Sequence, residues 1–229
     1  MSAMNYNWEK ELVARMQKIY LLKKQDGTVF PEHDLSHALR VKNLCLWIVK
    51  REHLHLDKEI LVASALLHDI GYTLDDSPEH TEASAQLANM WLSKVRFQKN
   101  KITSVVVCIK NHDTVPGRLG WKEEVPIECK VLRDADSIES FGCLGIIRFA
   151  MWSGRNKTPI YNQKLNDNKN GVFPNINLIK NIEIRTAELM TRCYTETAKR
   201  LLEQRLKNMQ MFVSEIKKEI NFAENLGGK

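Results

Sequence analysis

The stretch LVASALLHDIGYTLDD, residues 61–76, joins a continuous apolar run to two ionisable side chains. Residues 61–67 are apolar but for one serine, and His68 and Asp69 follow directly. The run predicts a fully buried helix that Gly71 ends. A histidine and an aspartate at the end of a buried helix are costly unless they find a partner or a cation. The stretch therefore predicts an all-helical core with polar chemistry at one helix end.

Other ionisable residues stand at or near the ends of other apolar helical segments: His37, His80, His112 and, inside KVLRDADSIESFG, Asp136. A single buried histidine is most often a satisfied core residue, but four histidines and two aspartates in such places indicate a site. Imidazole and carboxylate together are good ligands for Mn, Fe, Co, Ni or Zn. Because cysteine is absent from the set, a structural zinc site is disfavoured. A His and Asp site with room for water suits hydrolysis.

The composition is that of one sizeable domain. The chain has 229 residues, of which 43% are hydrophobic, and this is enough for a substantial core. The sequence contains no run of 18 apolar residues, so no membrane span is predicted. The N-terminal MSAMNYNWEK lacks the apolar segment of a signal peptide. The five cysteines are scattered without a CxxC pair. We therefore expect a reduced, cytoplasmic protein with neither disulfides nor a thiolate zinc site.

The charge balance bears on the kind of partner. The formal net charge is +6, which favours anionic partners such as nucleotides or nucleic acid, or else reflects a solvated basic surface. The lysines are dispersed and form no basic block, so a nucleic-acid patch is not indicated.

Helical periodicity accounts for almost the whole chain, and no alternating strand pattern occurs. Asp57 is expected to cap the helix that carries the opening stretch, and Ser77-Pro78 is a helix-start pair. The fold class is therefore all-α, in a single domain over residues 1–229. The predicted helices span about 7–24, 35–51, 57–69, 78–94, 99–111, 127–139, 144–154, 178–191 and 195–222.

Two segments stand apart from this rhythm. Residues 153–177 are rich in Asn and Lys and hold two prolines, so they are either a lid over a site or a surface insertion. The C-terminal helices, within 178–222, end in an apolar seam with alternating spacings of four and three residues. This seam packs on its own domain or on a partner helix, as in a homodimer. Its members are Leu202, Leu206, Met209, Val213, Ile216 and Ile220.

The order of the polar residues resembles a known family. His37, then His68-Asp69, then Asp136 is similar to the H…HD…D signature of the HD-domain metal-dependent phosphohydrolases. The surrounding stretches resemble a bacterial subfamily of stand-alone HD hydrolases, described as nucleotide-directed phosphohydrolases or diphosphatases. The resemblance covers about residues 30–155. It rests on HDLSHALRV (33–41), ALLHDIG (65–71), HTEASAQLA (80–88), IKNHD (109–113) and RDADSIESFGCLGIIRFA (133–150).

The resemblance implies a helical bundle with a metal site between its helices. By it, one divalent ion (Mn, Co, Ni, Fe, Zn or Mg) is held by His37, His68, Asp69 and Asp136. Two further histidines fall where two-metal members of the family supply extra ones. They would ligate a second metal, orient a water or contact a phosphate, and the sequence leaves these three roles open. These two are His80 and His112.

For the candidate residues around the four ligands, two roles are possible. His33 and Asp34 are candidates for outer-sphere partners that fix the tautomer of His37, and Asp34 could equally be a helix N-cap. Asp134 is either an outer-sphere residue or a helix-surface acid. Three arginines are candidates for phosphate contacts, or else are surface or salt-bridge residues: Arg40, Arg133 and Arg148.

Departures from related branches narrow the resemblance. HD 5′-nucleotidases commonly carry a glutamate three residues past the HD aspartate, where this chain has Tyr72. The ppGpp hydrolases carry a Glu-Asp pair just after the HD motif, where this chain has Tyr72-Thr73. The HD-GYP phosphodiesterases have a lysine after HDIG and a later GYP, and both are missing here.

The expected function is therefore metal-dependent hydrolysis of a small-molecule phosphate, a nucleotide or related phosphoester or diphosphate, by metal-activated water. Two alternatives remain. A di-iron HD-fold oxygenase would also use extra histidines, and a non-catalytic nucleotide- or protein-binding module would suit the charge and the C-terminal seam.

Overall fold

The structure is a computed structural model that describes residues 7–25, 27, 30–74, 80–114, 124–161 and 177–226. These residues form α-helices, short 3-10 helices and turns, with no strand among them, so the all-α prediction is confirmed. The α-helices are α1 (Trp8–Gln25), α2 (Leu35–Arg51), α3 (Lys58–Leu67), α4 (His80–Lys94), α5 (Ile102–Asn111), α6 (Ile127–Glu139), α7 (Gly142–Arg155), α8 (Leu178–Thr191) and α9 (Glu196–Leu226). The 3-10 helices are η1 (Pro31–His33), η2 (Ile70–Thr73) and η3 (Lys99–Lys101).

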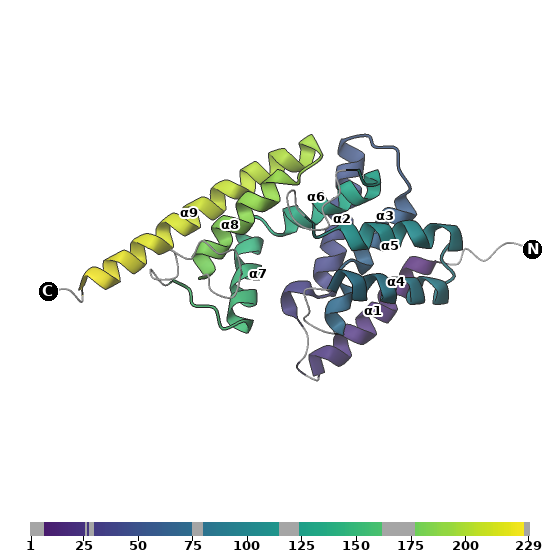
Figure 1. Cartoon of the computed structure of the whole chain (residues 1–229), viewed down its shortest axis with the longest axis horizontal. Helices are drawn as coiled ribbons and strands as arrows, with labels where there is room; N and C mark the ends of the chain where they lie inside the picture. The colour runs from purple at the N-terminus through teal and green to yellow at the C-terminus, as the bar shows by residue number, and fades with distance from the viewer. Residues whose placement is uncertain are drawn as a thin grey trace, which may run out of the picture.

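Helix α3 lies at the centre of the molecule. Every residue from Leu61 to Leu67 is buried, as expected of a helix that is apolar all round. Leu61 and Ala65 belong to a hydrophobic cluster that extends through α6 to α9, whereas Leu66 and Leu67 belong to a second cluster with α1, α4 and α5. Figure 1 shows α7, α8 and α9 together on one side of the molecule and α1 to α5 on the other.

Local capping explains where the central helices begin. The Asp57 carboxylate accepts hydrogen bonds from the backbone N–H groups of Glu59 (2.9 Å) and Ile60 (3.2 Å) at the start of α3. The Asp34 carboxylate accepts one from the backbone N–H of His37 (2.9 Å) at the start of α2. Such caps satisfy donors that the first helical turn leaves free.

Gly71 follows the end of α3, and its role extends beyond the helix end. Helix α3 itself stops at Leu67, two residues before the predicted end. A Cβ atom at Gly71 would lie 2.3 Å from the carbonyl oxygen of His80 and 2.8 Å from the backbone nitrogen of Ser84. Only glycine therefore allows η2 to approach α4 this closely.

Each predicted helix is present in the described part of the chain. Helices α6 and α8 have the predicted bounds, α7 begins at Gly142 and α9 continues to Leu226. The helix-start pair Ser77-Pro78 and residues 162–176 of the predicted lid or insertion lie outside the described residues. Of that segment, α7 takes residues up to Arg155, and Asn177 caps α8.

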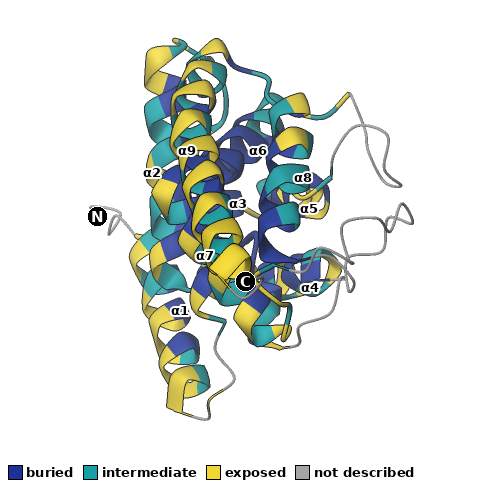
Figure 2. Ribbon diagram, turned by 90° about the vertical axis from the view of Figure 1, so that its left-hand side faces the viewer, coloured by how far each residue is buried: buried dark blue, intermediate teal, exposed yellow. Residues whose placement is uncertain are grey.

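The apolar seam of α9 packs on its own domain. Leu202, Met209 and Val213 are buried in the cluster that includes α7 and α8, and Ile216 and Ile220 pack against it. Figure 2 shows the exposed outer surface of α9 against the buried residues beneath it. None of the described helices has the length and apolar character needed to cross a bilayer.

Candidate metal centre

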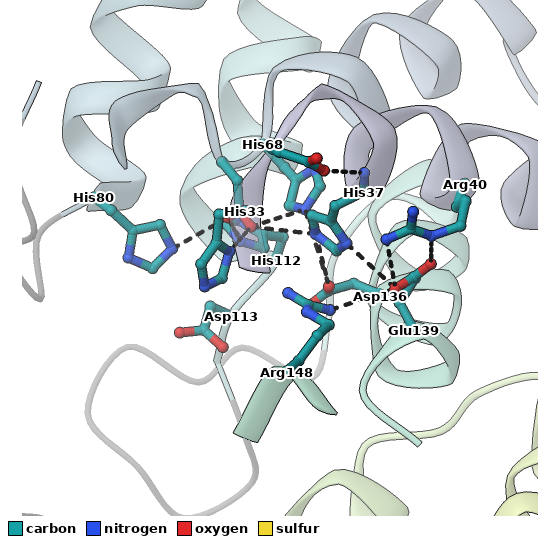
Figure 3. Close-up of polar contacts among 12 residues, drawn as sticks. His33, His37, Arg40, His68, His80, His112, Asp113, Asp136, Glu139 and Arg148 are labelled. Carbon is teal, nitrogen blue, oxygen red and sulfur yellow. Dashed lines mark hydrogen bonds and ion pairs between the residues drawn. The ribbon is translucent and has the colours of Figure 1, made fainter. Parts of the chain in front are cut away.

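The four predicted ligands lie close together at one place, here called the primary site (His37, His68, Asp69 and Asp136). Figure 3 shows His37, His68 and Asp136 there. The Nε2 atoms of His37 and His68 are 3.1 Å apart. Asp69 Oδ2 lies 3.3 Å from each of these two nitrogens. Asp136 Oδ1 lies 3.6 Å from His37 Nε2 and 3.9 Å from His68 Nε2.

Three helices and one turn bring these residues together. His37 is in the first turn of α2, His68 is the C-cap of α3, Asp69 follows it, and Asp136 is in the last turn of α6. Because α2 packs on both α3 and α6, residues distant in sequence meet between them. All four side chains are buried, so their charge and polarity need local compensation.

The spacing of the four donor atoms fits one divalent ion. Two ligand atoms bound at about 2.1 Å to one ion, at angles of about 90–110°, lie about 3.0–3.4 Å apart. The observed separations of 3.1–3.9 Å are close to these values. Nitrogen and carboxylate donors suit the divalent metals Mn, Fe, Co, Ni and Zn.

Hydrogen bonds orient two histidine rings for ligation. His68 Nδ1 lies 2.8 Å from the carbonyl oxygen of Ala65, and His112 Nδ1 lies 2.7 Å from that of Ile109. A carbonyl oxygen only accepts hydrogen bonds, so each Nδ1 carries the proton and donates a hydrogen bond. In the neutral ring the Nε2 lone pair is then free to bind a metal.

Asp69 presents its second oxygen to two more histidines. Its Oδ1 lies 3.3 Å from His112 Nε2 and 3.5 Å from His80 Nε2. The ring centroids of His80 and His112 are 5.4 Å apart. Asp69 therefore faces the histidines of the primary site with one oxygen and two further histidines with the other, and His80 and His112 could contribute to holding a second ion.

The two aspartates are held in their ionised form. Burial raises the pKa of Asp69, but His68 and His33 outweigh it and hold the pKa well below its ordinary value. Burial likewise raises the pKa of Asp136, and His68 and His37 lower it further than burial raises it. The site therefore carries buried negative charge, which a divalent cation would neutralise.

The histidines have opposite shifts. Burial lowers the pKa of His37, and Arg148 adds to the effect. Burial also lowers the pKa of His80, to about 4. At His112 burial lowers the pKa, but the hydrogen bond and charge of Asp69 outweigh it and raise the pKa to about 9. A cation bound beside Asp69 would compete with the proton on His112.

Glu139 was missed by the sequence reasoning. Its side chain is buried, its Oε2 lies 3.6 Å from His37 Nδ1, and its Oε1 accepts a hydrogen bond from Arg40 Nε. It lies one turn after Asp136 on α6, and this i+3 spacing was the available signal. The contact with Arg40 shows that this arginine pairs with Glu139, and the predicted phosphate contact of Arg40 has no further support.

His33 and Asp34 take different roles. His33 Nδ1 lies 2.6 Å from Asp69 Oδ2, so its partner is Asp69, whereas the sequence suggested His37. The His33 ring stacks on Tyr72, with centroids 4.1 Å apart, and Tyr72 stacks in turn on His80 at 4.3 Å. Asp34 is the N-cap of α2, the second of its two predicted readings.

Arg133 and Asp134 contact the residues that precede α9. The fully buried Arg133 donates hydrogen bonds to the carbonyl oxygen of Asn111 (2.7 Å) and the Tyr194 hydroxyl (2.6 Å). Asp134 accepts from the backbone N–H groups of Tyr194 (2.9 Å) and Thr195 (2.7 Å). These contacts tie both side chains to the protein interior, and Asp134 is buried, so it is not a helix-surface acid.

The primary site adjoins a cavity of about 460 Å³. Asp69, Asp136 and three arginines line it: Arg148, Arg185 and Arg192. Only Arg148 was predicted from the sequence. Arg192 is buried and its Nη2 lies 3.3 Å from Asp136 Oδ2, so it ties the end of α8 to the site. Arg192 is far from Asp136 in the sequence, so no local sequence pattern predicts their contact.

Known proteins share this architecture. A family model described as HD domain matches residues 34–140. YpgQ from Bacillus subtilis is 26% identical over 189 residues, which make up 82% of this chain and 84% of YpgQ.

Solved structures agree in fold at low identity. The structure of B. subtilis YpgQ in complex with ADP aligns with a TM-score of 0.68 at 21% identity, covering 93% of this chain and 94% of YpgQ. An HD-superfamily hydrolase from Bacillus thuringiensis aligns with a TM-score of 0.65 at 21% identity, covering 94% and 99%. Residues 34–140, which the family model matches, include all four residues of the primary site. Residues 34–140 thus match the HD domain family model, and the described helices share the fold of a solved HD-superfamily hydrolase.

Proposed function

We propose that the protein is a metal-dependent phosphohydrolase that acts on a nucleotide or a related phosphoester or diphosphate. One observation carries the proposal. Asp69 and Asp136 of the primary site line a cavity whose walls also carry Arg148, Arg185 and Arg192. Metal ligands and guanidinium groups around one space are what the binding of a phosphate ester requires.

A divalent ion at the primary site would supply Lewis acidity and lower the pKa of a water toward neutrality. The chain's own residues bind and orient the phosphate. Arg148 Nη1 is buried without a hydrogen-bond partner among the described residues, and its contact with Glu139 Oε2 is 3.7 Å long. This donor would bind a phosphate oxygen. His80 and His112, on the second oxygen of Asp69, are proposed as ligands of a second ion.

The size and walls of the cavity favour a nucleotide over inorganic phosphate. Its volume of about 460 Å³ falls in the range of about 300–1,000 Å³ typical of sites for drug-sized ligands. Phe149 and Trp152 supply aromatic surface in the same cavity. YpgQ, a relative with the same fold, was crystallised with ADP.

Activity measurements test the proposal. Phosphate release is assayed with Mn²⁺ on nucleoside mono-, di- and triphosphates and on p-nitrophenyl phosphate, with added pyrophosphatase to detect diphosphate products. We expect wild type to hydrolyse at least one substrate, and His68→Ala and Asp69→Ala to lose more than about 100-fold of this activity. His55→Ala, at an exposed histidine, serves as the matched control and should retain it.

Two results would contradict the proposal. One is turnover by His68→Ala at the wild-type rate. The other is oxygen uptake by the Fe(II)-loaded protein without any phosphate release, which would indicate the oxygenase alternative instead. The oxygen-uptake assay is included because Asp69 lies between two groups of histidines, and a di-iron oxygenase would also use the extra histidines.

A further inference from the structure

Helices α7 and α8 supply part of the wall of the cavity that adjoins the primary site. Arg148, Phe149 and Trp152 line it from α7, and their spacing of one and four residues places them on one face of that helix. Arg148 lies beside Glu139, and Trp152 lies one helical turn farther along α7. This wall therefore carries both charged and aromatic surface.

Helix α8 supplies the opposite wall. Arg192, just past its end, contacts Asp136, whereas Asn181 lies in its first turns. Both line the cavity, as does Leu189. At about 1.5 Å of rise per residue, Asn181 lies roughly 16 Å along the axis from Arg192. The two residues therefore lie at opposite ends of this wall.

Asn181 is an unusual residue for its place. Its side chain is 3% exposed, and its Oδ1 has no hydrogen-bond partner among the described residues. A buried amide oxygen without a donor destabilises the folded state, and asparagine is a poor helix former. A leucine would fill the same space without either cost. An unsatisfied polar group that lines a cavity is explained if a ligand supplies the missing donor.

We infer that the α7–α8 end of the cavity is a nucleobase slot, in which the Asn181 amide hydrogen-bonds to an N–H group of the base. Phe149, Trp152 and Leu189 contact the base around it. Aromatic side chains stack on any base, and an amide that meets a base edge adds directionality. The inference rests on the proposed function, since it places the phosphates at the primary site.

Binding of non-hydrolysable probes separates the two ends. The Mn²⁺-loaded protein is titrated calorimetrically with α,β-methylene analogues of ADP, GDP, CDP and UDP, and with methylenediphosphonate, which has no base. We expect wild type to bind at least one nucleotide analogue about 10-fold or more tightly than methylenediphosphonate. In Asn181→Leu this preference should fall about 10-fold, while methylenediphosphonate binds as before. Asn89→Leu, at an exposed asparagine on α4, should behave as wild type.

Stability gives a second readout. Asn181→Leu should unfold at the same or a higher temperature than wild type, because it removes the unsatisfied oxygen. If that variant fails to fold, Trp152→Ala, at a partly exposed position, should lower the nucleotide preference in the same way.

Three results would overturn the nucleobase slot: equal affinity of wild type for all five probes, an unchanged preference in both variants, or an equal loss for methylenediphosphonate. The phosphohydrolase proposal fails separately, by the absence of phosphate release.

Discussion

Glu139 shows how a residue outside the ligand set can control the site. Its Oε2 lies 3.6 Å from His37 Nδ1, the ring nitrogen opposite the one that faces the other ligands. His37 Nδ1 is buried and has no hydrogen-bond partner within normal distance among the described residues. A carboxylate behind a metal-bound histidine fixes its tautomer and raises its basicity. Glu139 is therefore placed to set how strongly His37 binds a metal.

Replacement of Glu139 by glutamine tests this role. We expect Glu139→Gln to weaken metal binding about 10- to 100-fold, measured by competition with a fluorescent chelator. Arg40→Met is the matched control, because it removes another partner of Glu139 and leaves the carboxylate beside His37. An equal loss of metal affinity in both variants would contradict this role, because it would assign the effect to the Arg40–Glu139 pair.

The ligands could be read from the sequence, but most of their surroundings could not. His68 and Asp69 end a buried helix, which makes them visible in one short stretch. Arg192 reaches Asp136 across 56 positions, and the contact depends on how α8 packs. The contacts of Arg133 were hidden for the same reason, since the sequence does not show that its guanidinium bonds to Asn111 and Tyr194.

At the scale of elements, the helices were predictable because their signals are local. Apolar spacing and caps such as Asp57 act within a few residues, so α6 and α8 have the bounds that were predicted. The predicted end of α3 was two residues too late. The need for Gly71 to clear the backbone of α4 is a tertiary constraint, and it does not appear in the helical pattern.

The cap of the central helix gives a test at this scale. Asp57→Ala should lower the free energy of unfolding by about 1–2 kcal/mol, measured by urea denaturation. Asp57→Asn is the matched control, because asparagine caps a helix about as well and loses only the ion pair with Lys101, whose Nζ lies 2.7 Å from Asp57 Oδ2. A loss of the same size in both would assign the effect to the ion pair.

The pH dependence of that ion pair follows from the pKa of Asp57. Burial raises this pKa, but hydrogen bonds from Lys101 and the backbone N–H of Ile60 outweigh it and leave the pKa lowered. A lowered folded-state pKa stabilises the protein above the unfolded pKa of about 3.9 and loses that contribution as the pH falls through the folded value. The difference between wild type and Asp57→Asn should therefore shrink below about pH 4.

At the scale of the whole molecule, the primary site joins the two hydrophobic clusters. Its ligands come from α2, α6 and the end of α3, and α3 contributes to both clusters. The cavity then opens toward α7 and α8, which lie on the other side of the molecule from α4 and α5 (Figure 1). This arrangement could not be predicted from the sequence, because periodicity shows which face of a helix is buried but not which helix covers it.

Metal content tests the central claim most directly. The purified protein, reconstituted with Mn²⁺ and freed of excess ion, is analysed for metal per chain, beside His68→Ala and the control His55→Ala. We expect about one ion or more per chain in wild type and His55→Ala, because four buried donors converge, and a loss of metal in His68→Ala. Wild type that retains no Mn, Co, Ni, Fe or Zn after reconstitution, or His68→Ala with the wild-type content, would contradict it.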